Sequence, residues 1–395
     1  MSASSKLGAL ETLRGLGAVL VLVHHLSLAF LPSAYQGSAA PAHFGWEAAF
    51  HETPLGSLIA GRFAVDLFFV LSGFVLSLSF LGPQARGHAD LAAAAVKRVF
   101  RLAPMVAVGM LLPVGLLHLG LTPHWDAASA TGSTMWLGRE LSNGAALSGV
   151  VRTLGLHLFS GSSGYNSALW TIGLELEGSF LVYGTLFLFR HSTWRWGAYA
   201  VSMIWLRHDL RVAFLAGLVL ADAWMTWPDF RCWAARGRVL GPVLVLVGWL
   251  GGYPHYLAVN GVKPAGWFRP LPFMNFGMDG WLLVGAVLLI AACVGSPLMM
   301  RALDCGPGRF LGRISFSLYA THIPVIISLG SGVFLWLHRS GQSYGMSVAV
   351  ASISTAIASI GLAVVVAQFV DRPSLRLSNW IGARFRASLS HSPAG

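Results

Sequence analysis

The chain has 395 residues, of which 55% are hydrophobic and only 10% are charged. An ordinary soluble domain carries about 25% charged residues, so this composition excludes that class and predicts an integral membrane protein. The net charge of +11 does not predict a nucleic-acid partner, because excess Lys and Arg in a multi-span protein first reports membrane topology. The three cysteines show neither paired nor metal-ligand spacing, so we expect no disulfide framework and no metal site.

About ten apolar segments are candidate membrane spans, and we predict an all-α protein whose helices enclose a polar cavity. The expected spans lie near 8–31, 63–81, 102–121, 169–189, 194–206, 211–226, 239–258, 272–294, 313–337 and 345–370. The fifth and sixth are short, so the expected count runs from nine to eleven. With the N-terminus inside, eighteen Lys and Arg fall on the inner side and eight on the outer side, the bias expected when both termini are cytoplasmic. The membrane domain then covers 1–375, and 376–395 forms a basic cytoplasmic tail.

The first apolar segment carries Arg14 near one end and the pair His24 and His25 further in. Eleven helical steps from Arg14 to His25 correspond to about 16 Å, which puts an imidazole near the middle of a membrane. Ionisable side chains at that depth usually mark a pathway or a reaction centre. The alternative is a signal anchor whose histidines face a helix bundle. Because adjacent residues lie about 100° apart around a helix, we expect only one of the two histidines to face a given cavity.

Two further clusters flank the second and third expected spans. Asp66 lies near the outer end of the second span, and Ser72 precedes a glycine, as in helices that pack closely. Lys97, Arg98 and Arg101 lie where the third span enters the membrane from inside. The arginines, three residues apart, share a helix face. They are either a positive-inside anchor or a clamp for a phosphate-bearing cytoplasmic substrate, because guanidinium groups bind phosphate bidentately.

Acidic and aromatic residues mark the fourth and ninth expected spans. Glu175 and Glu177 follow Trp170, and residues two apart point to different sides of a helix, so at most one glutamate faces a given cavity. Such a carboxylate either serves a functional cavity or forms a buried ion pair. In the ninth span, Tyr319 and His322 precede a proline, which frees a backbone carbonyl one turn earlier. The His322 side chain either packs between helices or borders a polar cavity.

Six motifs in this order resemble the integral-membrane acyltransferase-3 family. They are Leu-x-x-Leu-Arg-Gly with ten residues between Arg14 and His25, Val-Asp-Leu-Phe-Phe-Val-Leu-Ser-Gly-Phe (65–74), Lys-Arg-x-x-Arg-Leu-x-Pro (97–104), Leu-Trp-Thr-Ile-x-x-Glu (169–175), Ile-Ser-Phe-Ser-Leu-Tyr-x-x-His-x-Pro (314–324) and Asp-Arg-Pro (371–373). The chain departs from the family where many members read Glu-x-Gln-Phe-Tyr, because here Glu175 is followed by Leu-Glu-Gly-Ser-Phe. The register of Glu175 against Glu177 therefore stays open.

The resemblance implies transfer of an acyl group, often acetyl, from cytoplasmic acyl-coenzyme A to a hydroxyl on a glycan, a glycolipid or a small molecule such as a macrolide. We expect a multi-pass protein of the bacterial inner membrane, in contact with the lipid bilayer and with neither a metal nor a nucleic-acid partner. A proton-coupled transporter or flippase is the competing class, because intramembrane His and Glu also suit transport. We find no related halves in the sequence, which favours the acyltransferase.

The resemblance also implies roles for individual residues. His25 is expected to be the general base, with Arg14 as its essential companion. Arg14 then binds the thioester oxygen, a coenzyme A phosphate or an acidic residue. The remaining expected roles are coenzyme A contacts for Arg98, Arg101 and Lys97; an acidic partner of His25 among Asp66, Glu175 and Glu177; and a substrate cavity that includes Glu177, His322, Tyr319, Trp170 and Ser72.

Overall fold

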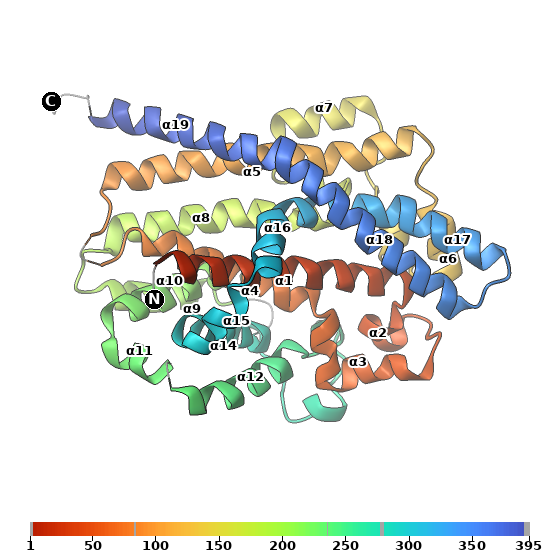
Figure 1. The fold of residues 1–395 in the computed structure, drawn as a ribbon, viewed down its shortest axis with the longest axis horizontal. Coiled ribbons are helices and arrows are strands. Elements are labelled where there is room, and N and C mark those ends of the chain that lie inside the picture. Colours follow the sequence, from red (N-terminus) through yellow and green to blue (C-terminus); the bar gives the residue numbers. More distant parts are fainter. Residues whose placement is uncertain (1–2, 83, 235, 277–279, 391–395) are drawn as a thin grey trace.

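The computed structural model describes residues 3–82, 84–234, 236–276 and 280–390, and within these ranges it is helical without strands (Figure 1). The principal helices are α1 (Ala3–Phe30), α4 (Gly61–Leu78), α5 (His88–His118), α8 (Trp170–Phe189), α10 (Val212–Thr226), α14 (Gly280–Gly295), α16 (Gly306–Val325) and α18 (Tyr344–Val366). The other α-helices are α2 (Ser33–Gln36), α3 (Ala48–Glu52), α6 (His124–Thr131), α7 (Leu147–Leu156), α9 (Arg195–Trp205), α11 (Pro228–Ala234), α12 (Gly237–Gly251), α13 (His255–Val259), α15 (Pro297–Leu303), α17 (Ser331–Arg339) and α19 (Arg372–Ser390).

Membrane-length helices are fewer than the sequence predicts. Six helical stretches of the described chain are long and apolar enough to cross a membrane, and a seventh counts if the bent pair α14 and α15 is one span. The expected spans at 194–206, 211–226 and 239–258 correspond to α9, α10 and α12, which have 11 to 15 residues. At about 1.5 Å rise per residue they are shorter than the roughly 30 Å hydrocarbon core. The count of ten is therefore not confirmed, whereas an all-helical, multi-pass membrane protein is.

Glycines bring α1 and α16 together at the centre of the molecule. A Cβ atom on Gly15 would lie 2.6 Å from the backbone nitrogen of Gly312, and one on Gly312 would lie 2.6 Å from the carbonyl oxygen of Glu11. Only a residue without a side chain permits this approach, as in other closely packed membrane helices. A Cβ atom on Gly73 of α4 would lie 2.1 Å from the Phe214 carbonyl oxygen of α10, which explains the glycine after Ser72. Close helix packing thus fixes α1 against α16 and α4 against α10.

One buried asparagine connects α5, α8 and α16. Pro113 and Pro324 lie inside α5 and α16, and each deprives the carbonyl four residues earlier of its helical partner. Those carbonyls belong to Gly109 and Ala320, and the Asn166 side-chain nitrogen donates to both, at 3.0 and 2.9 Å. The Asn166 side-chain oxygen accepts from the Ala168 backbone N–H just before α8. The freed carbonyl expected in the ninth span is therefore satisfied by a side chain from the segment that precedes α8.

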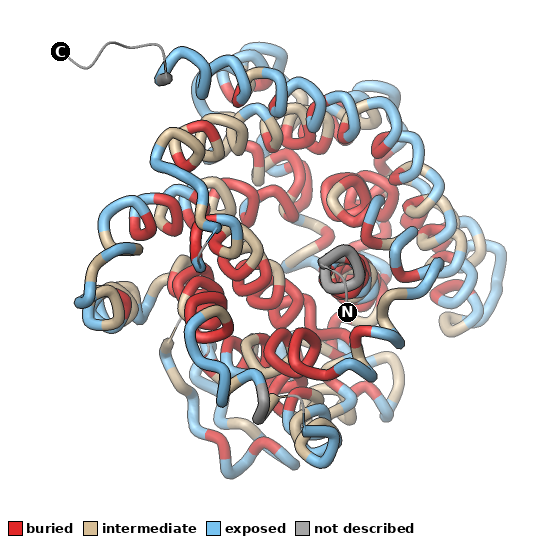
Figure 2. Tube along the Cα trace, turned by 60° about the vertical axis from the view of Figure 1, so that its left-hand side comes forward, coloured by how far each residue is buried: buried red, intermediate tan, exposed pale blue. Residues whose placement is uncertain are grey.

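The C-terminal helices lie on the outside of the bundle (Figure 1). A π-helical turn at Ala367–Asp371 joins α18 to α19, and α19 packs against α5. Many residues of α19 are exposed, whereas the helices at the centre are mostly buried (Figure 2). The start of α1 and the end of α19 lie on the same side of the molecule. The expected tail at 376–395 is thus helical to Ser390, and 391–395 lie outside the described residues.

Candidate active site

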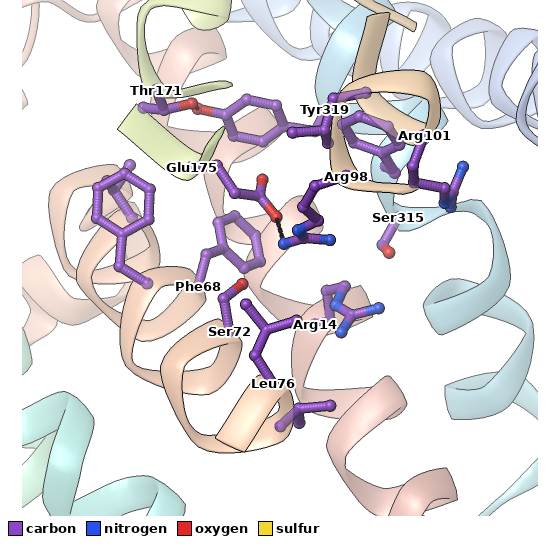
Figure 3. Close-up of a pocket in the computed structure, with 15 residues that line it drawn as sticks. Arg14, Phe68, Ser72, Leu76, Arg98, Arg101, Thr171, Glu175, Ser315 and Tyr319 are labelled. Atoms are coloured by element: carbon purple, nitrogen blue, oxygen red, sulfur yellow. Dashed lines mark hydrogen bonds and ion pairs between the residues drawn. The ribbon is translucent and has the colours of Figure 1, made fainter. Parts of the chain in front are cut away.

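A first cavity, which we call the arginine pocket, opens between α1, α4, α5, α8 and α16 (Figure 3). Three guanidinium groups and one carboxylate face it, together with hydroxyl groups and apolar side chains. Its polar lining residues are Arg14, Ser72, Arg98, Arg101, Thr171, Glu175, Ser315 and Tyr319. The side chains of the two α5 arginines are each about one fifth exposed. The excess of positive charge in the pocket favours an anionic ligand.

Arg98 is held by α8. Its Nη2 donates to the Glu175 carboxylate at 2.7 Å, and its Nε donates to the Ser179 hydroxyl at 2.9 Å. Ser179 in turn donates to the Glu175 carbonyl at 2.7 Å, so one turn of α8 supplies both acceptors. Glu175 is therefore the half-buried ion-pair partner of Arg98, and it lines the arginine pocket. Glu177, two residues on, has 55% of its side chain exposed and pairs with Arg211 at 3.1 Å.

Arg101 joins α5 to the end of the last membrane helix. It forms an ion pair with the Asp371 carboxylate, and its Nη1 also donates to the Asp371 carbonyl at 3.3 Å. The guanidinium carbon lies 5.5 Å from the centre of the Phe316 ring. Asp371 belongs to the Asp-Arg-Pro motif, and it sits in a π-helical turn, a feature common at functional sites. The motif thus fixes one edge of the arginine pocket.

A second cavity, which we call the histidine pocket, contains His25. Its lining residues are Val21, His24, His25, Tyr35, Gly61, Arg62, Val65, Trp170, His255, Tyr256, Val259 and Tyr319. Both neighbouring histidines border it, so the expectation that only one would do so is wrong. The two rings are 5.1 Å apart and edge to face, and the His24 Nδ1 lies 2.8 Å from the Ile59 carbonyl, which holds that ring against the wall.

One hydrogen-bond partner of His25 is another histidine. Nδ1 of His25 lies 2.8 Å from Nε2 of His322, which is fully buried. The other nitrogen of His322, Nδ1, lies 3.0 Å from the Leu318 carbonyl, which only accepts, so Nδ1 carries the hydrogen. With both rings neutral, Nε2 of His322 is then an acceptor and Nδ1 of His25 must donate to it. This assignment leaves the lone pair of His25 on Nε2.

Three of the other predicted residues line a pocket, whereas four line neither: Asp66, Lys97, Glu177 and His322. Ser72 lines the arginine pocket, Trp170 the histidine pocket, and Tyr319 both. Asp66 is buried, 3.9 Å from the Arg62 guanidinium on the same helix. The aliphatic part of Lys97 lies against Gly382 of α19, where a Cβ atom would meet it at 2.4 Å.

Sequence reasoning missed three contributors to this site. Trp136 stacks on His25 with ring centres 5.1 Å apart, and it comes from a loop whose sequence gives no signal of that placement. Thr171 shares a 2.7 Å hydrogen bond with the Tyr319 hydroxyl. Asn166 could have been noticed as a capping-type residue just before the fourth span.

Comparison with known proteins agrees with these motifs. A family model described as an acyltransferase domain matches residues 7–370. The chain is 23% identical to the O-acetyltransferase PaAT-1 of Phomopsis amygdali, over 94% of this chain and 83% of that protein. It is 24% identical to the acyltransferase clz18 of Cochliobolus lunatus, over 73% of this chain and 72% of that protein. No solved structure matches. Because the family model covers nearly the whole chain, this protein belongs to the acyltransferase-3 family and is an acyltransferase.

Proposed function

We propose that this protein is a membrane O-acetyltransferase, which takes an acetyl group from acetyl-coenzyme A in the arginine pocket and transfers it to an acceptor hydroxyl in the histidine pocket. The observation that carries the proposal is the pair of adjoining cavities, one lined by three arginines and the other by His25. The name of the Phomopsis relative, an O-acetyltransferase, supports the acetyl group and the hydroxyl acceptor.

His25 is the proposed general base. The acceptor oxygen attacks the thioester carbon, and its proton passes to Nε2 of His25 as the C–O bond forms. The C–S bond then breaks, and the sulfur of coenzyme A leaves as a thiol with the proton from His25, which returns the ring to its neutral form. A positioned base of this kind contributes typically about 10²–10⁴-fold to a rate. His322 takes the orienting role for which the sequence pointed to a carboxylate.

Arg14 is proposed to bind the donor. It lines the arginine pocket, and it lies about 16 Å from His25 along α1, given eleven residues of helical rise. That separation favours contact with the phosphate-bearing part of acetyl-coenzyme A over contact with the carbonyl at His25. Arg98 and Arg101 provide further positive charge, although each already has a carboxylate partner. Lys97, the fourth proposed donor contact, does not line this pocket.

The proposals for the acceptor and for the membrane location of the protein rest on aromatic side chains and on charge distribution. Tyrosine and tryptophan rings in the histidine pocket suit a ring-bearing acceptor, such as a glycan, a glycolipid or a secreted small molecule. We propose that both termini are cytoplasmic, in line with the surplus of Lys and Arg on that side. The short helices α9, α10 and α12 then complete the expected bundle of about ten segments. The bacterial inner membrane stays a prediction, and the relatives named above are fungal.

Thiol release from acetyl-coenzyme A tests the proposal. Purified full-length protein in detergent is expected to release thiol slowly without an acceptor and faster with the correct one. His25→Ala should lower the rate at least 100-fold, while His338→Ala, an exposed histidine on α17, should leave it unchanged. Folded wild-type protein that neither binds nor cleaves acetyl-coenzyme A would contradict this donor. Equal rates for the wild type and His25→Ala would contradict the assigned base.

A further inference from the structure

The arginine and histidine pockets meet at two side chains. Val65 of α4 and Tyr319 of α16 line both cavities, and they are the residues that the two linings share in the described chain. Their exposed fractions are 6% and 7%. A donor whose phosphates lie among the arginines therefore has to bring its acyl group past these two side chains to reach His25.

Neighbouring helices hold Tyr319 in place. The Thr171 hydroxyl donates to the Ala168 carbonyl at 3.2 Å, so the Tyr319 hydroxyl, 2.7 Å away, donates to Thr171. The Tyr319 ring also lies edge-on to Phe68 of α4, with centres 5.7 Å apart (Figure 3). Val65 is β-branched, and in a helix such a side chain has one strongly preferred rotamer. Both sides of the passage are therefore fixed by packing.

We propose that Val65 and Tyr319 form a steric gate that selects the acyl group of the donor, admitting acetyl and excluding longer chains. The inference rests on the proposed function, because it places the donor among the arginines and the base at His25. Extra methylene groups enter a well-packed wall only by displacing its side chains, which is unfavourable. A longer acyl-coenzyme A then binds through its shared nucleotide part but does not present its thioester to His25.

Donor selectivity tests the gate. Thiol release is measured with acetyl-, butyryl- and octanoyl-coenzyme A on the full-length protein and compared as kcat/KM. The wild type should prefer acetyl over butyryl at least tenfold. Val65→Ala should raise the butyryl-to-acetyl ratio at least fivefold, and Tyr319→Ala should raise it further. Tyr319→Phe keeps the ring and should keep the preference for acetyl. Val70→Ala, at a buried valine of α4 that lines neither pocket, removes the same methyl groups and should leave the ratio unchanged.

The possible outcomes separate the gate from the reaction. Equal wild-type rates with all three donors, or an unchanged ratio in Val65→Ala, would overturn the gate and leave the acyl-coenzyme A activity standing. No thiol release from any donor would overturn the proposed function and the gate with it. If Tyr319→Ala does not fold, Val65→Ala against Val70→Ala decides the question.

Discussion

The two pockets are built from different interactions. In the arginine pocket, ion pairs join residues distant in the sequence, such as Arg98 with Glu175 and Arg101 with Asp371. In the histidine pocket, rings contact rings, and His25 is oriented by a neutral hydrogen bond to His322. Fixed charge suits an anionic ligand, whereas a neutral imidazole pair suits proton transfer. If the proposed donor and base sites are correct, donor binding and chemistry are separable, and mutants should show a split between KM and kcat.

The largest effect in this comparison is expected at His322. His322→Leu removes the acceptor that holds the His25 tautomer, so kcat should fall about 100-fold, within the range of a positioned base, while the KM for acetyl-coenzyme A changes little. His322→Gln offers a side-chain oxygen as a substitute acceptor and should recover part of the rate. Steady-state kinetics on both variants measures this. Equal losses in the two variants would mean that His322 acts through packing alone.

The opposite split is expected in the arginine pocket. Arg101→Gln removes a charge-assisted contact of roughly 1.5–3 kcal/mol, which corresponds to a rise in KM for acetyl-coenzyme A of about 10- to 100-fold with a much smaller change in kcat. Arg236→Gln removes an exposed arginine that lines neither pocket and is the matched control. If Arg101→Gln lowers kcat and leaves KM unchanged, the two pockets do not divide binding from chemistry.

The sequence predicted the local features of the two pockets better than it predicted the number of membrane spans. Helical class and family followed from composition and motif order, because apolar helices and short signatures are local properties. The opposite directions of Glu175 and Glu177 followed from helix geometry, and the structure places them that way. The span count did not follow, because hydropathy detects apolar segments but not where each helix ends.

Partners across the bundle could not be predicted at all. The pairing of His25 with His322, and of Arg101 with Asp371, depends on which helices are neighbours, and those contacts join residues 297 and 270 positions apart. The loop that brings Trp136 onto His25 follows no periodic pattern. Long-range contacts of this kind require the tertiary structure.

Asn166 is expected to affect both pockets together, because it connects helices that line each of them. Asn166→Leu leaves the Gly109 and Ala320 carbonyls without their shared donor, and each unsatisfied buried group costs about 1–3 kcal/mol. The melting temperature should fall, and kcat and KM should both worsen. Asn143→Ala, at an exposed asparagine of the same loop region, should change neither. A stable variant with wild-type kinetics would show that the three helices do not depend on this bridge.

The smallest effect is expected at Glu140, in the loop that carries Trp136 to the histidine pocket. Burial raises the pKa of this carboxyl from 4.5 to about 7, although the Ser167 N–H donates to it at 3.2 Å. Between those values the folded protein binds the proton that the unfolded chain has lost, so stability decreases as pH rises from 4.5 to 7. Glu140→Gln keeps an acceptor for Ser167 without the charge. It should raise the free energy of unfolding at pH 8 by about 3 kcal/mol, and the melting temperature with it, and change both little at pH 4.5. Thermal unfolding at the two pH values measures the difference, and an equal shift at both would assign it to packing instead of ionisation.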